Sequence, residues 1–160
     1  MRAIKNLLSE SAESTRGIGI LLAKFLQPGD VVLLTGSLGA GKSELARGIA
    51  AGLGVSGPVT SPTFTLLNIH ETNTVPLHHF DWYRVEDAEE LLLAGLDEQI
   101  GGDSITLIEW HERAPELIPD NHLEIIIQPL SEESRKIDIV PGNGFRNMGA
   151  MKLEGLEIDL

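Results

Sequence analysis

Residues 31–51 read VVLLTGSLGAGKSELARGIAA and contain the pattern G-x-x-x-x-G-K-S, which runs from Gly36 to Ser43. The apolar run VVLL that precedes the pattern is typical of a buried strand. The residues that follow it repeat apolar side chains at helical spacing. A strand, a glycine-rich turn and a helix in this order are the context in which the pattern binds phosphate.

The residue types in this loop predict a nucleotide phosphate site. Its glycines allow backbone angles that are closed to other residues, so backbone N–H groups can approach a ligand closely. These groups converge on an anion together with the positive end of the helix. Lys42 supplies a charge for the β- and γ-phosphates, and the Ser43 hydroxyl can bind Mg²⁺.

The rest of the chain predicts an α/β fold with a mixed sheet. A helix capped by Ser9 or Ser11 should run to about residue 26, and a second helix should cover 88–96. Strand patterns cover 64–69 with 77–80, and 123–127 with 135–140, each pair joined as a hairpin. A short apolar strand, 105–108, ends at Glu109. We therefore expect one three-layer P-loop domain over residues 1–144 and a mobile C-terminal tail over 145–160.

Composition limits the functions that the chain can have. Its 160 residues carry a formal net charge of −12 and no cysteine. A chain this acidic is not expected to bind free RNA or DNA, because that binding depends on Lys and Arg. No apolar run reaches the ~18 residues of a membrane span, and the N-terminus does not resemble a signal peptide. Absence of cysteine is compatible with a cytoplasmic protein.

Two carboxylates compete for the metal-side role that a P-loop requires at the end of a neighbouring strand. Glu109 follows an apolar strand, whereas Asp81 follows the less apolar run LHHF. We favour Glu109 by about two to one from this pattern, since ligands bind at the carboxyl edge of such sheets. Zinc is disfavoured, because adjacent His78 and His79 would point to opposite faces of a strand. No Asn-Lys-x-Asp sequence is present to select guanine, so ATP is the expected nucleotide.

Five segments in this order resemble the bacterial TsaE family, formerly called YjeE. They are GSLGAGKS (36–43), SPTFTL (61–66), HFDWYR (79–84), EELLLAGLDE (89–98) and LIEWHERA (107–114). The resemblance covers about residues 10–140. It implies a cytoplasmic ATPase needed for N6-threonylcarbamoyladenosine in tRNAs that read codons starting with A. It also implies TsaB and TsaD as partner proteins, so that tRNA is met only through them.

The same resemblance assigns roles to individual residues. In the loop, the residues that would contact ATP are Ser37, Leu38, Gly39, Ala40, Gly41, Lys42, Ser43 and Glu44. Lys42, Asp81 and Glu109 would be catalytic, and Ser43 with Glu109 would bind Mg²⁺. Thr63 would lie in a switch-like segment beside the γ-phosphate, with Trp110 next to the site. Arg135 would contact the nucleotide, as would the segment 11–15 near the N-terminus.

The sequence departs from the family pattern at Ser37, Glu44 and His111, where Asp, Thr and Pro are common. Glu44 matters most, because that position usually offers a hydroxyl to the α-phosphate. A carboxylate ~6 Å from a phosphate charge would cost about 2.8 kcal/mol at an effective dielectric of ~20, which is an upper figure because Glu44 can turn to solvent. Two alternatives to the ATPase stay open. One is a P-loop small-molecule kinase, and the other is a nucleotide-dependent interaction protein with negligible hydrolysis.

Overall fold

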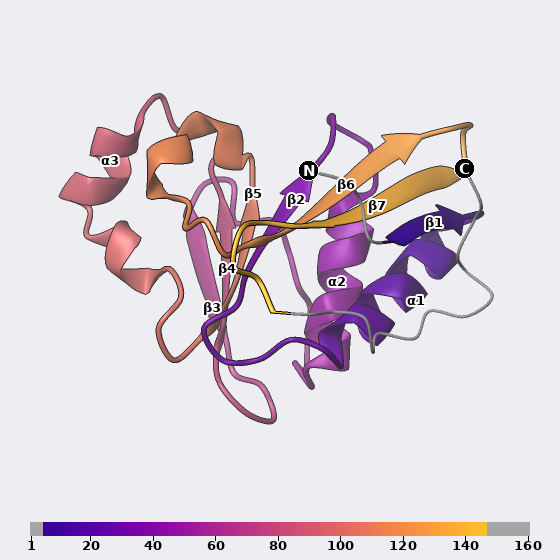
Figure 1. Cartoon of the computed structure of the whole chain (residues 1–160), viewed down its shortest axis with the longest axis horizontal. Helices are drawn as coiled ribbons and strands as arrows, with labels where there is room; N and C mark the ends of the chain where they lie inside the picture. Colours follow the sequence, from indigo (N-terminus) through magenta and orange to yellow (C-terminus); the bar gives the residue numbers. More distant parts are fainter. Residues whose placement is uncertain (1–4, 147–160) are drawn as a thin grey trace.

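Strand β2 (Val31–Thr35) lies at the centre of a seven-stranded mixed sheet, and its four apolar residues are buried. The computed structural model describes residues 5–146. β2 pairs in parallel with β5 (Ile105–Glu109) on one side and with β6 (Leu123–Pro129) on the other. The strand order is β1-β7-β6-β2-β5-β4-β3 (Figure 1).

Two hairpins extend the parallel centre, as the strand patterns predict. β3 (Leu67–His70) pairs antiparallel with β4 (Leu77–Asp81), which lies parallel to β5. On the other side β6 pairs antiparallel with β7 (Arg135–Pro141). An unpredicted edge strand, β1 (Lys5–Ser9), pairs antiparallel with β7.

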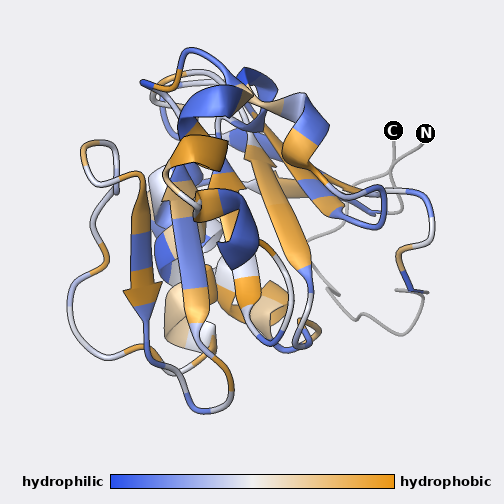
Figure 2. Cartoon of the chain, turned by 90° about the vertical axis from the view of Figure 1, so that its left-hand side faces the viewer, coloured by the Kyte–Doolittle hydropathy of each residue, from blue (hydrophilic) through white to orange (hydrophobic). Residues whose placement is uncertain are grey.

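The sheet separates two apolar layers, because neighbouring residues of a strand point to opposite faces. Val32 and Leu34 belong to one core cluster, which they share with helices α1 (Ala12–Ala23) and α2 (Lys42–Gly52). The opposite cluster contains alternate β2 residues, Trp82 and the short helix α3 (Ala88–Leu93). Figure 2 shows the central strands coloured largely as hydrophobic. The three-layer α/β prediction is therefore confirmed.

Helices α1 and α2 touch through their backbones at two glycines. A Cβ on Gly48 would lie 2.0 Å from the carbonyl oxygen of Arg16, and one on Gly19 would lie 2.6 Å from that of Leu45. Both are far below normal contact distance, so only glycine permits this approach. The contact places the helix that follows the phosphate loop directly beside α1 (Figure 1).

Several boundaries differ from the predicted ones for local reasons. Ser11, not Ser9, caps α1, since its hydroxyl accepts a bond from Ser14 N at 3.0 Å while Ser9 lies in β1. α1 ends at Ala23 rather than near 26. β3 starts at Leu67, because the chain turns at Leu66 with a φ of 67°.

The second half of the chain differs in the same way. Gly95 has a φ of 73°, so the predicted helix ends at Leu93 and is followed by the 3-10 helix η1 (Leu96–Gln99). The loop after β5 contains two further 3-10 turns, η2 (His111–Arg113) and η3 (Pro115–Leu117). Within residues 5–146 the last strand ends at Pro141, and residues 147–160 of the predicted tail lie outside the described residues. Among the described residues, no helix has the length and apolar character needed to cross a bilayer.

Candidate nucleotide-binding site

The glycine-rich loop joins β2 to α2 at the carboxyl edge of the sheet. Gly39 and Gly41 have φ values of 78° and 113°, which other residues rarely adopt. Gly41 is also the N-cap of α2, and no side chain caps that end of the helix. The first N–H groups of α2 therefore have no side-chain acceptor, as an anion-binding helix terminus requires.

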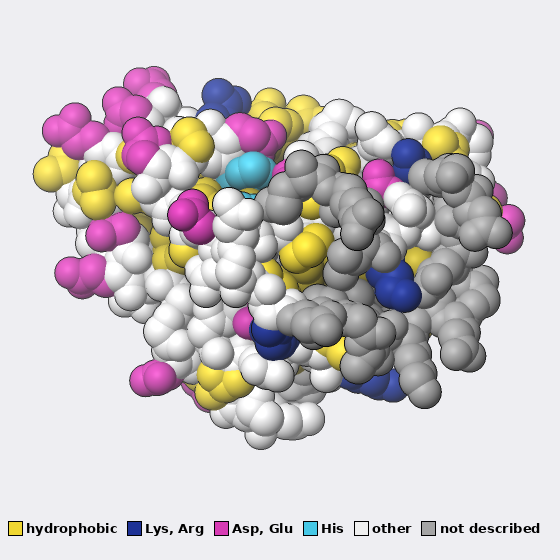
Figure 3. Space-filling model, viewed as in Figure 1, with side chains coloured by type: hydrophobic (Ala, Val, Ile, Leu, Met, Phe, Trp, Pro, Cys, Tyr) yellow, Lys and Arg dark blue, Asp and Glu magenta, His cyan; other side chains and the backbone are white. Residues whose placement is uncertain are grey.

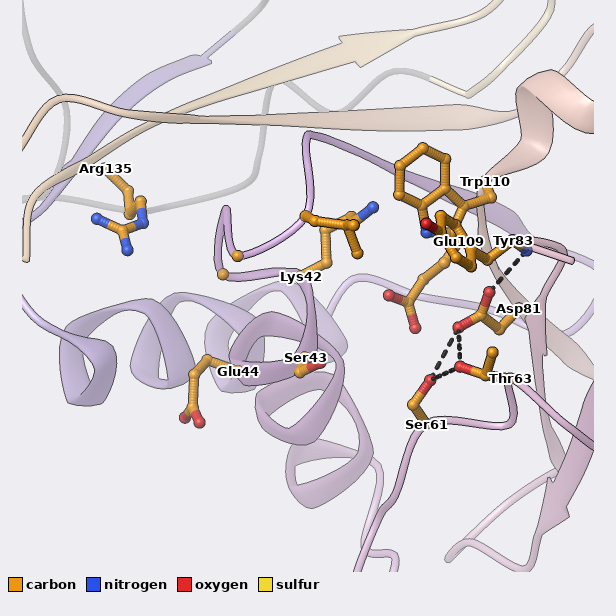
Figure 4. Close-up of a pocket in the computed structure, with 13 residues that line it drawn as sticks. Lys42, Ser43, Glu44, Ser61, Thr63, Asp81, Tyr83, Glu109, Trp110 and Arg135 are labelled. Carbon is orange, nitrogen blue, oxygen red and sulfur yellow. Dashed lines mark hydrogen bonds between the residues drawn. The ribbon is translucent and has the colours of Figure 1, made fainter. Parts of the chain in front are cut away.

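A cavity of about 330 Å³ opens between this loop and the ends of β4 and β5 (Figure 4). Most of the predicted site residues line it: Leu38, Gly39, Gly41, Lys42, Ser43, Glu44, Thr63, Asp81, Glu109, Trp110 and Arg135. Ser61 and Tyr83 also line it and were not predicted. Of the remaining predicted residues, Ala40 is fully buried, and Ser37 lies at an adjoining cavity on the other side of the loop.

Lys42 is held between the loop and an aromatic ring. Its Nζ donates a hydrogen bond to Gly36 O at 2.7 Å and lies 3.8 Å from the centroid of the Trp110 ring. Trp110 adopts a φ of 61°, and its ring packs 4.9 Å from that of Tyr83. Burial lowers the pKa of the Lys42 amine, and the charge of nearby Glu109 opposes that shift.

Asp81 organises the segment that contains Ser61 and Thr63. Its Oδ2 accepts hydrogen bonds from the Ser61 and Thr63 hydroxyls at 2.8 and 3.0 Å. Its Oδ1 accepts one from Tyr83 N at 2.9 Å. Figure 4 shows these groups together on one side of the cavity. Both oxygens of Asp81 are therefore engaged by the protein.

Glu109 has a different environment, although it is the direct neighbour of Asp81 in the β4–β5 pairing. Only its Oε2 is bonded, to Nε2 of buried His79 at 2.8 Å. Within residues 5–146, no group bonds to its Oε1. The Glu109 side chain points into the cavity (Figure 4), so this oxygen is the carboxylate atom most open to a cation there.

Glu44 lies beside the loop but its charge is matched. Its Oε2 accepts a bond from Arg16 Nε at 3.0 Å, and its Oε1 one from Arg47 at 2.6 Å. Figure 4 shows its carboxylate turned away from Lys42 and Glu109. Both oxygens of the Glu44 carboxylate are therefore paired with arginine side chains.

Arg135 and the N-terminal segment lie on the far side of the loop. Arg135 Nε donates to Ala40 O at 2.7 Å, and its Nη1 donates to backbone carbonyl groups of the β6–β7 turn. Thr15 and Arg135 line a smaller cavity of about 160 Å³ that also reaches Gly41 and Glu44. Ser11 instead caps α1. Arg135 thus braces the loop backbone as well as lining the main cavity.

The histidines of the described residues that form hydrogen bonds have separate partners and do not form a cluster. His78 bonds the backbone of Gln99, and His111 lies 2.9 Å from the Thr35 hydroxyl, next to Glu124. No three His, Cys, Asp or Glu side chains of the described residues converge in a way that could hold an ion by themselves. A metal bound here would therefore need ligands from elsewhere, such as phosphate.

The donor set fits a magnesium nucleotide. A lysine, uncapped helix N–H groups and left-handed glycines suit phosphate, whereas the Ser43 hydroxyl and the free oxygen of Glu109 suit Mg²⁺. Mg²⁺ is commonly held by one or two such groups plus phosphate oxygens.

Sequence reasoning missed Ser61, Tyr83 and the contact of His79. Strand periodicity could have revealed His79, because it lies two residues before Asp81 and so on the same face of β4. A search for metal-ligand patterns does not find this contact, because the partner of His79 is a carboxylate and not an ion.

Comparison with known proteins relates the chain to one family. A family model described as "Threonylcarbamoyl adenosine biosynthesis protein TsaE" matches residues 9–137. The Bacillus subtilis protein called tRNA threonylcarbamoyladenosine biosynthesis protein TsaE is 42% identical over 125 residues, 78% of each chain. Proteins of the same name from Nostoc and Treponema pallidum are 41% and 36% identical, covering 82% of this chain and 82% and 97% of their own. The crystal structure of Bacillus subtilis YdiB superposes with a TM-score of 0.74 at 34% identity, over 88% of this chain and 87% of that one.

Proposed function

The chain belongs to the TsaE family, and from this premise we propose that it is a magnesium-dependent ATPase that serves the synthesis of threonylcarbamoyladenosine in tRNA. The observation that carries the proposal is the convergence of the glycine-rich loop, Lys42, Ser43 and two strand-end carboxylates on one cavity. The role in tRNA modification is proposed from the names of the relatives, and ATP hydrolysis is proposed from the residues of the site.

Some residues of the site would bind the phosphates and Mg²⁺, and others would orient the attacking water molecule. Backbone N–H groups of the loop and the Lys42 amine would hold the phosphates, and Ser43 and Glu109 would hold Mg²⁺. When bound, Mg²⁺ neutralises charge that develops on the phosphate oxygens. Asp81 keeps Ser61 and Thr63 fixed at the cavity, where a side-chain hydroxyl can orient a water molecule. Trp110 covers the Lys42 amine and would limit water beside it, and Tyr83 packs against the Trp110 ring.

The surface charge supports a role that depends on partner proteins. Residues 85–99 contain six carboxylates and no Lys, Arg or His. Acidic side chains gather around exposed leucines over α3 in Figure 3. Such a surface repels the phosphates of a free tRNA. We infer that TsaB and TsaD are the partners, that tRNA is reached only through them, and that the protein acts in the cytoplasm.

Nucleotide turnover tests the proposal most directly. ATP hydrolysis would be measured for the chain alone, with TsaB and TsaD added, and with small alcohol acceptors. We expect weak turnover alone and an increase with TsaB and TsaD. A turnover rate that does not change when TsaB and TsaD are added would contradict the tRNA-modification role. Transfer of phosphate to an acceptor would establish the kinase alternative instead.

Thermal melting separates binding from hydrolysis. Mg-ATP at ~100 times its dissociation constant should stabilise the fold by about 2.7 kcal/mol. For a chain of this size that corresponds to roughly 5–11 °C in melting temperature. A shift without turnover, alone or with TsaB and TsaD, would establish the interaction protein with negligible hydrolysis.

A further inference from the structure

His79 and Glu109 form a buried pair directly behind the nucleotide cavity. His79 Nε2 lies 2.8 Å from Glu109 Oε2, and the two side chains are 2% and 5% exposed. They come from neighbouring parallel strands, with His79 two residues before Asp81 on β4 and Glu109 at the end of β5. The pair is thus built into the sheet and not into a loop.

Hydrogen bonding identifies the nitrogen that carries the proton. The other ring nitrogen, Nδ1, is buried and has no partner among the described residues. A proton on Nδ1 would be a buried donor without an acceptor, whereas an unprotonated Nδ1 leaves only a lone pair unused. The imidazole therefore presents an N–H at Nε2, which donates to the carboxylate of Glu109.

This bond decides which oxygen of Glu109 remains available. Oε2 is occupied by His79, and Oε1 has no bond within residues 5–146 while the side chain points into the cavity (Figure 4). Without the N–H donor, the carboxylate could rotate about its terminal torsion, which is broad for Glu. Carboxylates that bind metals are commonly held by a further hydrogen bond of this kind.

We propose that His79 is a positioning residue for magnesium: it holds Oε2 of Glu109 so that Oε1 faces the bound ion. This inference rests on the proposed function, because it assigns His79 a role toward the Mg²⁺ that the ATPase would use. His79 itself is buried and does not line the nucleotide cavity. The competing explanation is that the pair only satisfies two buried polar groups.

Two amide substitutions distinguish positioning from packing. In His79→Gln the amide nitrogen reaches about as far as Nε2, so the donor to Glu109 is kept. In His79→Asn the amide is one methylene shorter and reaches only about as far as Nδ1, so the donor is lost. His79→Phe keeps the bulk of the ring without the donor, and it replaces His79→Asn if that variant fails to fold.

The readout is the gain in nucleotide affinity that Mg²⁺ provides. Calorimetry would measure the dissociation constant of a non-hydrolysable ATP analogue with EDTA and with increasing Mg²⁺, and melting without ligand would check folding. We expect His79→Asn to require 10–100-fold more Mg²⁺ than the wild type, the usual range for loss of such a partner. Its affinity with EDTA should stay within about twofold, and His79→Gln should stay close to the wild type in both measurements.

Two results would overturn the role of His79 without contradicting the proposed function. One is a wild-type magnesium requirement in the donor-free variants, and the other is an equal rise for His79→Gln and His79→Asn. A wild-type chain that binds the analogue equally well with EDTA and with Mg²⁺ would contradict the proposed magnesium-dependent function, and the role of His79 would fall with it. The wild-type titration therefore distinguishes the two failures.

Discussion

Glu44 Oε2 accepts a hydrogen bond from Arg16 Nε at 3.0 Å, and this bond joins the helix of the phosphate loop to its neighbour α1. Arg47 holds the other oxygen of Glu44 at 2.6 Å. Two guanidinium groups thus face a single carboxylate. The penalty of about 2.8 kcal/mol at ~6 Å applies to an uncompensated charge, so the net effect on a bound phosphate should be much smaller.

The first prediction follows from this compensation. Glu44→Gln removes one negative charge and leaves both guanidinium groups in place, so it should improve the affinity for Mg-ATP, by at most about a hundredfold. The double variant Arg16→Ala/Arg47→Ala should weaken affinity, because it exposes the charge of Glu44. Calorimetry with Mg-ATP measures both effects. Adding Glu44→Gln to the double variant is the control, since it should restore affinity if the arginines act through Glu44. Unchanged affinity in the double variant, or no recovery when Glu44→Gln is added to it, would contradict the compensation.

The second prediction separates the two strand-end carboxylates by their bonding. Asp81→Asn disturbs three hydrogen bonds, so it should lower both turnover and stability, the latter by about 1–3 kcal/mol. Glu109→Gln keeps an acceptor for His79, so it should lower turnover at least tenfold while the melting temperature stays close to wild type. Turnover and thermal melting are measured for each variant.

Asp103→Asn provides the matched control for these carboxylates, because Asp103 is exposed in the turn before β5. It should change neither property. Equal losses of stability in Asp81→Asn and Glu109→Gln would refute the distinction, as would full turnover in either of them.

Local sequence was sufficient for the features that depend on neighbouring residues. The strand, loop and helix around Lys42 follow one another directly, and the hairpin β6–β7 is joined by a short polar turn. The carboxyl ends of β4 and β5 were identified because a predicted strand is followed by a carboxylate in each case, Asp81 and Glu109. Their proximity then follows from parallel pairing, which the register of β4 and β5 confirms.

Contacts between distant residues could not be predicted in this way. Glu44 is 28 residues from Arg16, and Ser61 is 20 residues from Asp81. Each pair meets only because of how the elements pack. The edge strand β1 was missed because KNLLS is short and its pairing partner, β7, is more than 120 residues away in the sequence.

The third prediction concerns acid stability next to the phosphate loop. Glu124 Oε2 lies 3.5 Å from His111 Nε2 and accepts a 2.6 Å bond from Thr35, the residue before Gly36. The hydrogen bond with His111, followed by that from Thr35, holds the pKa of the Glu124 carboxyl below its ordinary value of 4.5, although burial opposes this. A lowered pKa means that the folded state binds the proton more weakly than the unfolded state. The stabilisation is therefore present above pH 4.5 and is lost as the pH falls through the folded-state pKa.

Glu124→Gln should accordingly lower the melting temperature at neutral pH but not in acid. A charged hydrogen bond contributes about 1.5 kcal/mol at the lower end, which is roughly 3–6 °C here. Melting of variant and wild type between neutral pH and pH 3 would show the difference shrinking below about pH 4.5. Glu116→Gln serves as the control, since Glu116 is exposed. A difference that stays constant with pH would contradict the assignment.

The last prediction tests the close contact of α1 and α2. In Gly48→Ala the new Cβ would lie 2.0 Å from Arg16 O, and backbone atoms on both sides cannot turn away as a side chain would. The helices must separate, so we expect the free energy of unfolding to fall by about 1–3 kcal/mol and the melting temperature by roughly 2–12 °C.

Gly17→Ala is the matched control, because a Cβ there meets nothing within 4 Å. Removing that glycine from the interior of α1 should raise stability by about 0.5–1 kcal/mol. Since Arg16 holds Glu44, separation of the helices should also weaken Mg-ATP binding in Gly48→Ala. Equal stability of the two variants would show that the helices can adapt, and the glycine contact would then not be what sets their spacing.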